Sequence, residues 1–451
     1  MKPYVLFLLA AAALQAEPAR GPLRPHPDNP RYFTDSSGRA VYLTGAHTWN
    51  SIVDMGPADP PPRFDFGKFL GWLEGYGHNF IRLWAWDLTN WEPRRYRETR
   101  HTVFPLPYAR TGPGKAIDGK PKFNLTRYDR EYFRRVERRV REAGRRGFYV
   151  SIMLFEGWGL QFSPGAWEAH PYHPENNVNG IDGKNLGVYT LADPKVTALQ
   201  EAYVGRVIDT VNRYDNVLYE ISNENHPGST DWQYHMIRFI HNYEKGKPKQ
   251  HPVGMTFQYK GGTNQALFDG PADWISPNRE GGYRDDPPAA DGSKVILSDT
   301  DHLWGIGGNA DWVWKTFLRG MNPLFMDPYD AVVLGKAFDP QFEPVRRNLG
   351  YTLEYARRVN LAAMKPAGEL ATSRYCLANP GKEYLVFVPG GGPVTVDLTA
   401  ASGQLRAEWF DPAANAKHPA GNAPGGARRE FTPPFSGSAV LHLSESIPNR
   451  D

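Results

Sequence analysis

Eight short apolar runs alternate with amphipathic helical patterns between residues 40 and 330 of this 451-residue chain. Such alternation is typical of βα units, because each step between parallel strands needs a connection as long as a helix. Eight strands of this kind predict a closed (β/α)8 TIM barrel, with a doubly wound open sheet as the competing fold. The predicted strands are Val41–Thr44, Asn79–Trp84, Gly147–Leu154, Asn216–Ile221, Val253–Gln258, Asp273–Ser276, Lys294–Ser298 and Pro323–Met326.

Apolar side chains at helical spacing predict the connecting helices. One such helix begins at Asp193-Pro194, where a capping carboxylate precedes a proline in the first turn. A closing helix is predicted over Pro344–Ala363. The others are marked by apolar positions in Phe66–Leu73, Tyr132–Ala143 and Met236–Tyr243.

The pattern changes after about residue 366. Short strands then follow one another between Gly, Pro and Asn turns, without a helical pattern, as in an antiparallel sandwich. We therefore predict a barrel domain over residues 17–365 and a β-sandwich domain over 366–451. The predicted sandwich strands are Glu383–Val388, Val394–Leu398, Leu405–Phe410 and Ala439–Leu443.

The first sixteen residues have the pattern of an export signal. Lys2 precedes an apolar run from Val5 to Leu14, and small residues lie at Ala13 and Ala16. The run is too short to span a bilayer. We expect residues 1–16 to be cleaved and the mature protein to be secreted or periplasmic, without contact to a membrane.

Charge and cysteine usage exclude several classes of protein. The 52 basic and 49 acidic residues nearly balance, and the basic cluster from Arg134 to Arg146 has the spacing of a solvated helix face, so nucleic acid is not an expected partner. Cys376 is the only cysteine, which excludes an intramolecular disulfide and favours a small buried residue. No ligand spacing for a metal, no Rossmann glycine pattern and no P-loop is present. We expect no metal and no cofactor.

Polar and aromatic residues follow almost every predicted strand. In a (β/α)8 barrel the active site is built where the strands end, so these residues would converge. Taken singly, each could be a cap, a turn residue or a surface side chain. The candidates are His47, Arg82, Trp84, Trp86, Glu156, Trp158, Asn223, Glu224, Tyr259, Asp299, Asp301, His302 and Trp304.

The sharpest signal is the segment Ile221-Ser-Asn-Glu-Asn-His226, which places a carboxylate beside an amide at the end of an apolar strand. Glycoside hydrolysis needs two carboxyl groups, one protonated to assist the leaving oxygen and one ionised to attack the sugar or activate water. Glu224 is the candidate for the protonated group. The competing interpretation is that Glu224 only caps the loop that follows.

Two motifs in order resemble the clan A, or cellulase-like, glycoside hydrolases. Asn223-Glu224 matches the pair that ends strand four in that clan, and Asn79-Phe-Ile-Arg82 matches its strand two. The resemblance spans roughly residues 30 to 340. It implies a (β/α)8 glycosidase acting on poly- or oligosaccharides without a cofactor. In it Glu224 would be the acid/base, Asn223 would bind a sugar hydroxyl and Arg82 would support the nucleophile.

The chain departs from the clan at strand seven, where a nucleophilic Glu is expected and Val295-Ile-Leu-Ser-Asp299 stands instead. Aspartate is shorter by one carbon–carbon bond, roughly 1.5 Å, whereas retaining and inverting carboxyl separations differ by only about 1 to 4 Å. We predict that Asp299 still attacks, as the nucleophile of a retaining glycosidase, with Asp301 as a substitute. Two alternatives stay open: the extra room could admit water and give inversion, or the nucleophile is lost. Asp299 could also serve only as an ion pair of Arg82.

Further candidates surround these acids. Glu156 ends strand three and is a rival partner for Glu224, since two neighbouring carboxyls would raise one pKa. His302 could orient an aspartate or contact sugar, and we assign His47 and Tyr259 to substrate contact as well. Aromatic faces stack on sugar rings but are also ordinary core material. The predicted sugar platforms are Trp84, Trp86, Trp158 and Trp304.

The C-terminal segment resembles a collagen-binding-type module found behind barrels of this kind. Tyr384–Pro389, Gly392–Asp397 and Trp409–Pro412 carry the likeness. We expect a packing or carbohydrate-contacting accessory. Two alternatives to a glycosidase stay open: a carbohydrate-binding or scaffold protein that has lost its nucleophile, and a collagen-directed adhesin acting through residues 366–451.

Overall fold

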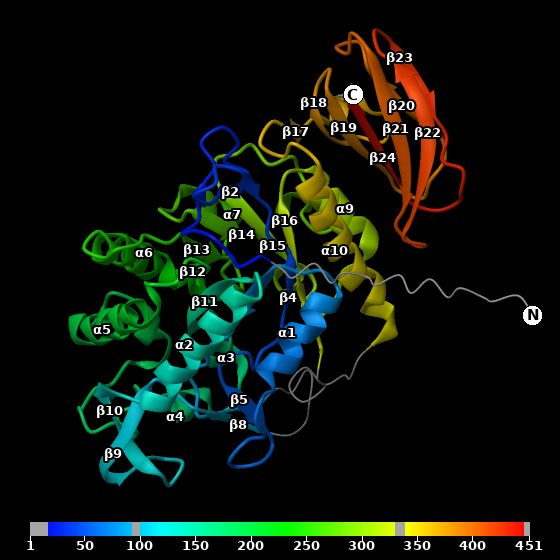
Figure 1. The fold of residues 1–451 in the computed structure, drawn as a ribbon. Helices are drawn as coiled ribbons and strands as arrows, with labels where there is room; N and C mark the ends of the chain where they lie inside the picture. The colour runs from blue at the N-terminus through cyan, green and yellow to red at the C-terminus, as the bar shows by residue number, and fades with distance from the viewer. Residues whose placement is uncertain (1–16, 93–99, 330–338, 446–451) are drawn as a thin grey trace, which may run out of the picture.

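The computed structural model describes residues 17–92, 100–329 and 339–445, and within them the chain forms a closed parallel barrel followed by an antiparallel β domain (Figure 1). The predicted fold is thus confirmed. The signal peptide predicted over residues 1–16 lies outside the described residues. Around the barrel the strands are β4 (Gly45–His47), β6 (Phe80–Leu83), β11 (Tyr149–Glu156), β12 (Val217–Asn223), β13 (Val253–Thr256), β14 (Trp274–Ser276), β15 (Val295–Asp299) and β16 (Asn322–Met326).

The first barrel strand is the one that the sequence misplaced. The predicted strand Val41–Thr44 ends where β4 begins, and Val41 instead pairs with Phe33 in a small N-terminal sheet. Before β4 the backbone N–H groups bond to side-chain amides instead of to a neighbouring strand. Leu43 N, for example, donates to Asn322 Oδ1 at 3.0 Å. That sheet contains β1 (Arg24–Pro25), β2 (Phe33–Thr34) and β3 (Ala40–Val41).

Aspartate side chains begin three of the surrounding helices. Asp65, Asp129 and Asp193 each accept a hydrogen bond from a backbone N–H of the first turn, at 2.8 or 2.9 Å. Such caps satisfy donors that have no partner inside the helix. The longer helices are α1 (Phe66–Gly75), α2 (Arg130–Arg145), α5 (Pro194–Val211), α6 (Thr230–Glu244), α7 (Asn264–Asp269), α9 (Ala310–Leu318) and α10 (Glu343–Arg358).

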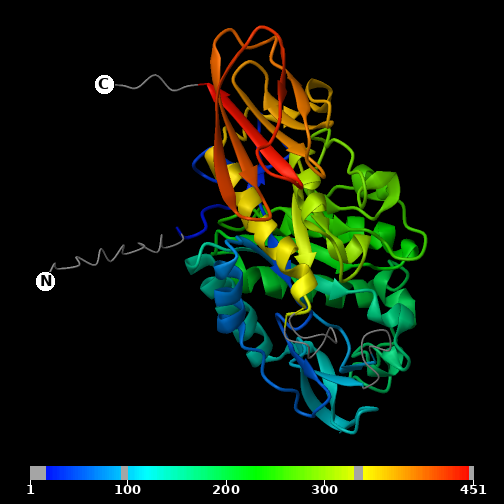
Figure 2. The same ribbon diagram turned by 90° about the vertical axis from the view of Figure 1, so that its right-hand side faces the viewer.

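A β-rich excursion that the sequence pattern did not predict extends from the end of β6 to the start of α2. Its strands form two small antiparallel sheets, one of them together with a segment that follows β4. The excursion lies at the opposite end of the molecule from the β-sandwich (Figures 1 and 2). Its strands are β7 (Asn90–Trp91), β8 (His101–Phe104), β9 (Tyr108–Lys115) and β10 (Pro121–Tyr128), and the segment after β4 that pairs with β8 is β5 (Asp54–Gly56).

The C-terminal domain packs a six-stranded sheet on a two-stranded one around its own core. Cys376 is buried there, as predicted. The four predicted strands are present, whereas the others were missed because they are short or rich in Gly and Pro. Its strands are β17 (Lys365–Pro366), β18 (Tyr375–Asn379), β19 (Glu383–Val388), β20 (Val394–Asp397), β21 (Gln404–Asp411), β22 (Ala416–Pro424), β23 (Arg428–Phe431) and β24 (Ala439–Glu445).

A buried aromatic cluster joins the two domains. Trp314 of α9 and Tyr355 of α10 pack against Phe387 and Phe410 of the sandwich, with ring centroids 5.4 to 6.3 Å apart. These ring contacts fix the β-sandwich on the barrel, because aromatic side chains bury a large apolar area.

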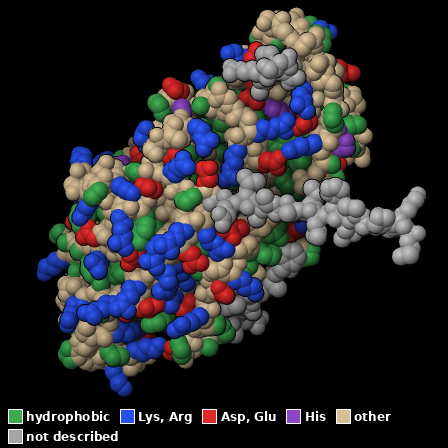
Figure 3. Space-filling view, viewed as in Figure 1, with side chains coloured by type: hydrophobic (Ala, Val, Ile, Leu, Met, Phe, Trp, Pro, Cys, Tyr) green, Lys and Arg blue, Asp and Glu red, His purple; other side chains and the backbone are tan. Residues whose placement is uncertain are grey.

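The exposed face of α2 carries the basic cluster. Arg130, Arg134, Arg138, Arg141 and Arg145 are exposed at helical spacing, and Figure 3 shows cations gathered over this helix. Its other face packs on the barrel and is mostly apolar, although it also buries Arg135 and Arg139, which the predicted solvated face had included. Within the described ranges, no helix has both the length and the apolar character to cross a membrane.

We predict that Phe410→Ala lowers the free energy of unfolding by about 3–5 kcal/mol, because it empties a fully packed aromatic position between the domains. Urea denaturation measures the change, with Leu191→Ala, which is 43% exposed, as the control expected to stay within about 0.5 kcal/mol. Equal, small changes for both variants would contradict the aromatic cluster as the joint between the domains.

Candidate functional site

A buried arginine is at the centre of the residues that end the barrel strands. Arg82 of β6 is 1% exposed, and its Nε and Nη2 donate to the two carboxylate oxygens of Glu220 at 2.9 and 2.6 Å. Nη1 donates to Asp299 at 2.9 Å and reaches Asp301 at 3.4 Å, and Nη2 also donates to Asn223 Oδ1 at 2.8 Å. One guanidinium therefore ties β6, β12 and β15 together.

Asp299 is the most tightly held of the acids. His47 Nε2 lies 3.1 and 2.9 Å from its two oxygens, and the Asp301 N–H donates to Oδ1 at 3.0 Å as the first cap of α8 (Thr300–Leu303). Burial opposes ionisation, but His47 and Arg82 together hold the pKa of Asp299 far below its usual range. Asp299 is thus a fixed anion with both oxygens engaged.

Asp301 lies two residues further on and is held more loosely. It retains 8% exposure against 0% for Asp299, and its nearest cation is the same Arg82 at 3.4 Å. Burial, reinforced by the Asp299 charge, raises the pKa of Asp301 to about 6 even though Arg82 opposes the shift. Asp301 can therefore change protonation state near neutral pH.

Glu224 directly follows β12 and has a left-handed backbone, with φ +43°. Its carboxyl group makes no hydrogen bond within the part of the chain that the structure describes. Burial, followed by the charges of Asp301 and Glu156, raises the pKa of Glu224 well above its usual value. The shift favours the protonated form of Glu224, which is the form that a general acid needs.

Asn223 and His302 form a polar chain beside Glu224. Asn223 Oδ1 accepts from Arg82, so His302 Nε2, at 3.2 Å from the same oxygen, acts as a donor. His302 Nδ1 then accepts from Ser276 Oγ at 2.7 Å. Burial lowers the pKa of His302 to about 3, which keeps the ring neutral. The chain turns the Asn223 amide so that its NH₂ is left for another partner.

Glu156, the rival carboxyl, is turned toward its own loop. Its two oxygens accept the backbone N–H groups of Trp158 and Gly159, both at 2.8 Å, and so cap α3 (Gly159–Phe162). Burial raises the pKa of Glu156 to about 8 although these N–H groups oppose the shift. This engagement favours a structural role over direct partnership with Glu224.

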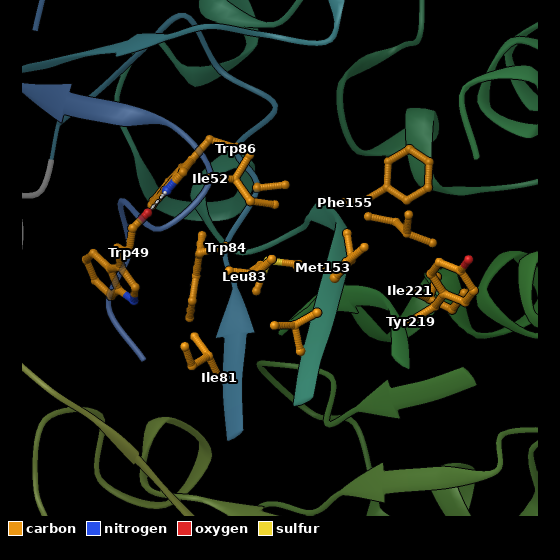
Figure 4. Packing of buried hydrophobic residues seen from close by; sticks show 14 of the residues in the cluster. Trp49, Ile52, Ile81, Leu83, Trp84, Trp86, Met153, Phe155, Tyr219 and Ile221 are labelled. Carbon is orange, nitrogen blue, oxygen red and sulfur yellow. Dashed lines mark hydrogen bonds between the residues drawn. The ribbon is translucent and has the colours of Figure 1, made fainter. Parts of the chain in front are cut away.

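The aromatic candidates divide by exposure. Trp84 is 1% exposed between His47, stacked at 5.5 Å, and the Arg82 guanidinium at 5.0 Å from its ring. Trp86, also 1% exposed, donates through Nε1 to the Trp49 carbonyl at 2.8 Å (Figure 4). Both form the packed wall of the site, so their burial argues against the predicted role as open sugar platforms. The half-buried aromatic residues are Trp158, Tyr259 and Trp304.

Sequence reasoning missed three residues of this region. Glu220 gave a signal, because a carboxylate inside the buried strand β12 needs a cation, and Arg82 is its partner. Ser276 and Gln161 gave none, since a serine at a strand end and a glutamine in a short helix are common. Among the described residues, no group of three or more His, Cys, Asp and Glu is arranged to hold a metal ion.

Comparisons with known proteins agree with the fold. A family model described as a domain of unknown function, DUF6298, matches residues 92–261, and the model "Putative collagen-binding domain of a collagenase" matches residues 367–441. No curated protein matches the sequence.

Among solved structures, a family 5 glycoside hydrolase from Bacteroides vulgatus superposes with a TM-score of 0.64 at 12% identity, covering 95% of this chain and 94% of its own. Another glycoside hydrolase superposes with a TM-score of 0.60 at 13% identity, covering 94% of this chain and 97% of its own. The predicted resemblance to clan A barrels followed by a collagen-binding-type module is confirmed at the level of the fold.

We predict that Arg82→Met lowers the free energy of unfolding by about 3–5 kcal/mol at neutral pH, because it leaves buried carboxylates without their cation. In the variant, Asp299 keeps His47 and the Asp301 N–H but loses the guanidinium, so burial raises its pKa relative to the wild type. The stability deficit therefore narrows as the pH falls toward about 5 and a proton is taken up. Urea denaturation across pH checks this, with exposed Arg134→Met as the matched control. A deficit that is small, or the same at every pH, would contradict the role of Arg82.

Proposed function

We propose that this protein is a glycoside hydrolase that cleaves O-glycosidic bonds of poly- or oligosaccharides. The observation that carries the proposal is the gathering of buried acids where the barrel strands end, with a cation on the aspartates. Burial raises the pKa of Glu224, which favours its protonated form, whereas Asp299 and Asp301 are ion-paired with Arg82. Glycoside hydrolysis requires one protonated and one ionised carboxyl group.

In the proposed mechanism, Glu224 protonates the leaving oxygen as Asp301 attacks the anomeric carbon. The bond from that carbon to the leaving oxygen breaks, and a glycosyl ester forms on Asp301. Glu224, now ionised, takes a proton from water as the water oxygen displaces Asp301. The configuration is thereby retained.

Asp301 is favoured over Asp299 as the attacking group because both oxygens of Asp299 are engaged. Asp299 would instead fix the loop and, with Arg82, tune Asp301. Of the two aspartate charges, that of Asp301 raises the pKa of Glu224 more than that of Asp299 does.

The Asn223 NH₂ group would bind a sugar hydroxyl, and Trp158, Tyr259 and Trp304 would supply apolar faces. The export pattern at residues 1–16 supports a secreted or periplasmic location. We further propose that residues 366–451 form a packing or carbohydrate-contacting accessory behind a catalytic domain of residues 17–365.

We predict that Glu224→Gln and Asp301→Asn each lower the turnover of unactivated glycosides by at least about 10²–10⁴-fold, since each removes one of the two acids. A panel of polysaccharides and aryl glycosides identifies the substrate first. Azide should then restore turnover to Asp301→Asn with inverted product and should not do so for Asp299→Asn. Rescue of Asp299→Asn alone would reverse the two aspartate roles.

We also predict a bell-shaped dependence of kcat/KM on pH. The value should rise with pH through about 6 as Asp301 loses its proton, and fall at higher pH as Glu224 loses the proton it must donate. The two limbs belong to the coupled pair, because the two acids interact. A profile that is already flat and maximal at about pH 4, below the Asp301 transition, would contradict Asp301 as the ionised group.

A second candidate is a carbohydrate-binding or scaffold protein that has lost its nucleophile. The sequestration of Asp299 by His47 and Arg82 is the observation that favours it. Silence of the wild-type protein on the whole panel, with sugar binding retained, would establish this candidate. Inverted product from an active wild-type protein would instead point to water as the attacking group.

A further inference from the structure

Glu224 has a backbone conformation that its residue type does not favour. Its φ of +43° lies in the left-handed region, which is unfavourable for a residue with a Cβ and persists only where its surroundings enforce it. The preceding Asn223 is the last residue of β12. A left-handed residue at this point turns the chain abruptly, so the direction of the Glu224 side chain depends on the contacts that hold its peptide groups.

A single side-chain amide holds the carbonyl side of Glu224. Gln161 Nε2 donates to the Glu224 carbonyl oxygen at 2.9 Å and to the Gly157 carbonyl oxygen at 2.8 Å. On the amino side, Glu224 N contacts Thr256 Oγ1 only at 3.4 Å. The Gln161 amide thus bridges two turns, one after β11 and one after β12. Its hydrogen bond to the Glu224 carbonyl is shorter than the contact between Glu224 N and Thr256.

The segment that carries Gln161 is itself fixed against the same turn. Gly157 N donates to the Asn223 carbonyl at 3.1 Å, and a Cβ at Gly157 would lie 2.3 Å from Asn225 Cγ, so the two backbones approach as closely as glycine allows. The Glu156 carboxyl caps the start of α3. Gln161 therefore has a defined position from which to hold Glu224.

The same short helix carries aromatic rings toward the site. Trp158 stacks near Phe162 at 5.1 Å, and Phe162 contacts Tyr259 at 4.9 Å. Trp158 and Tyr259 are half-buried and are two of the proposed sugar platforms. The element that would bind sugar is thus linked through one amide to the residue that would protonate it.

We propose that Gln161 is a positioning residue for Glu224, enforcing the left-handed turn that aims the acid at the scissile oxygen. The role in catalysis rests on the proposed function, whereas the control of the Glu224 backbone does not. Gln161 contacts neither substrate nor the reacting atoms in this scheme. Glu156 contributes by capping α3, which carries Gln161. This gives the buried Glu156 carboxyl group a structural role without any part in the reaction.

Gln161→Met tests this, because methionine keeps the side-chain length and lacks the amide donors. The matched control is Gln250→Met. Gln250 Nε2 also donates to two backbone carbonyls, those of Glu244 and Lys247, at 2.9 Å each. It precedes the start of β13 and so lies away from the carboxyl ends of the barrel strands. Crystal structures of both variants should show Glu224 leaving the left-handed region in Gln161→Met only. Retention of φ near +43° with an unmoved carboxyl in Gln161→Met would overturn the proposal, whether or not a substrate is known.

Kinetics provide the second measurement once the panel has identified a substrate. Gln161→Met should lower kcat about 10- to 100-fold on an aryl glycoside with a poor leaving group and much less on the dinitrophenyl glycoside, which needs little acid assistance. KM should change little. Equal losses on both substrates, or none, would overturn the positioning role, whereas an inactive wild-type protein would count against the proposed function and leave the crystallographic result to decide on Gln161.

Discussion

The pairing of Arg82 with Glu220 and Asp299 is the interaction on which the rest of the site depends. Three charged groups are removed from water inside a barrel, which is unfavourable unless every partner is present with good geometry. Here the guanidinium uses Nε, Nη1 and Nη2 on groups from two other strands. The arrangement fixes the relative positions of β6, β12 and β15 at the end where the chemistry is proposed.

The two aspartates differ because of this arrangement. Asp299 contacts His47, Arg82 and a backbone N–H, so both of its oxygens are engaged in stabilising the structure. Asp301 lies further from Arg82, at 3.4 Å. The charges of Arg82 and Asp299 therefore still act on its pKa, but its carboxyl group is held less tightly, as the proposed reaction requires. In the proposed mechanism the shorter residue at strand seven need not reach the sugar itself, because Asp301, two residues further on, supplies a second carboxyl group on the same Arg82.

Much of this could be predicted from the sequence. Alternating apolar runs located the barrel strands because burial on both faces leaves a clear pattern, and the Asn-Glu and Asn-x-x-Arg motifs located Arg82, Asn223 and Glu224. Strand one was misplaced because side-chain amides replace ladder hydrogen bonds before Gly45. The excursion after β6 was missed because its short strands carry no regular alternation.

The division of roles among the acids was beyond sequence reasoning. Whether Glu156 reacts or caps a helix depends on two backbone N–H groups in the loop after it, and whether Trp84 is open depends on rings and cations packed on it from β4 and β6. Gln161 and Ser276 act through single hydrogen bonds that leave no pattern. Only the folded geometry assigns them.

His47 and Arg82 together keep Asp299 ionised and leave Asp301 as the aspartate that titrates. Carbon-13 NMR of carboxyl-labelled aspartate, assigned with Asp299→Asn and Asp301→Asn, measures both groups in the intact protein. We expect Asp301 to titrate near pH 6 and Asp299 to stay ionised until the protein unfolds in acid. Titration of Asp299 near neutral pH, with Asp301 ionised throughout, would contradict this assignment.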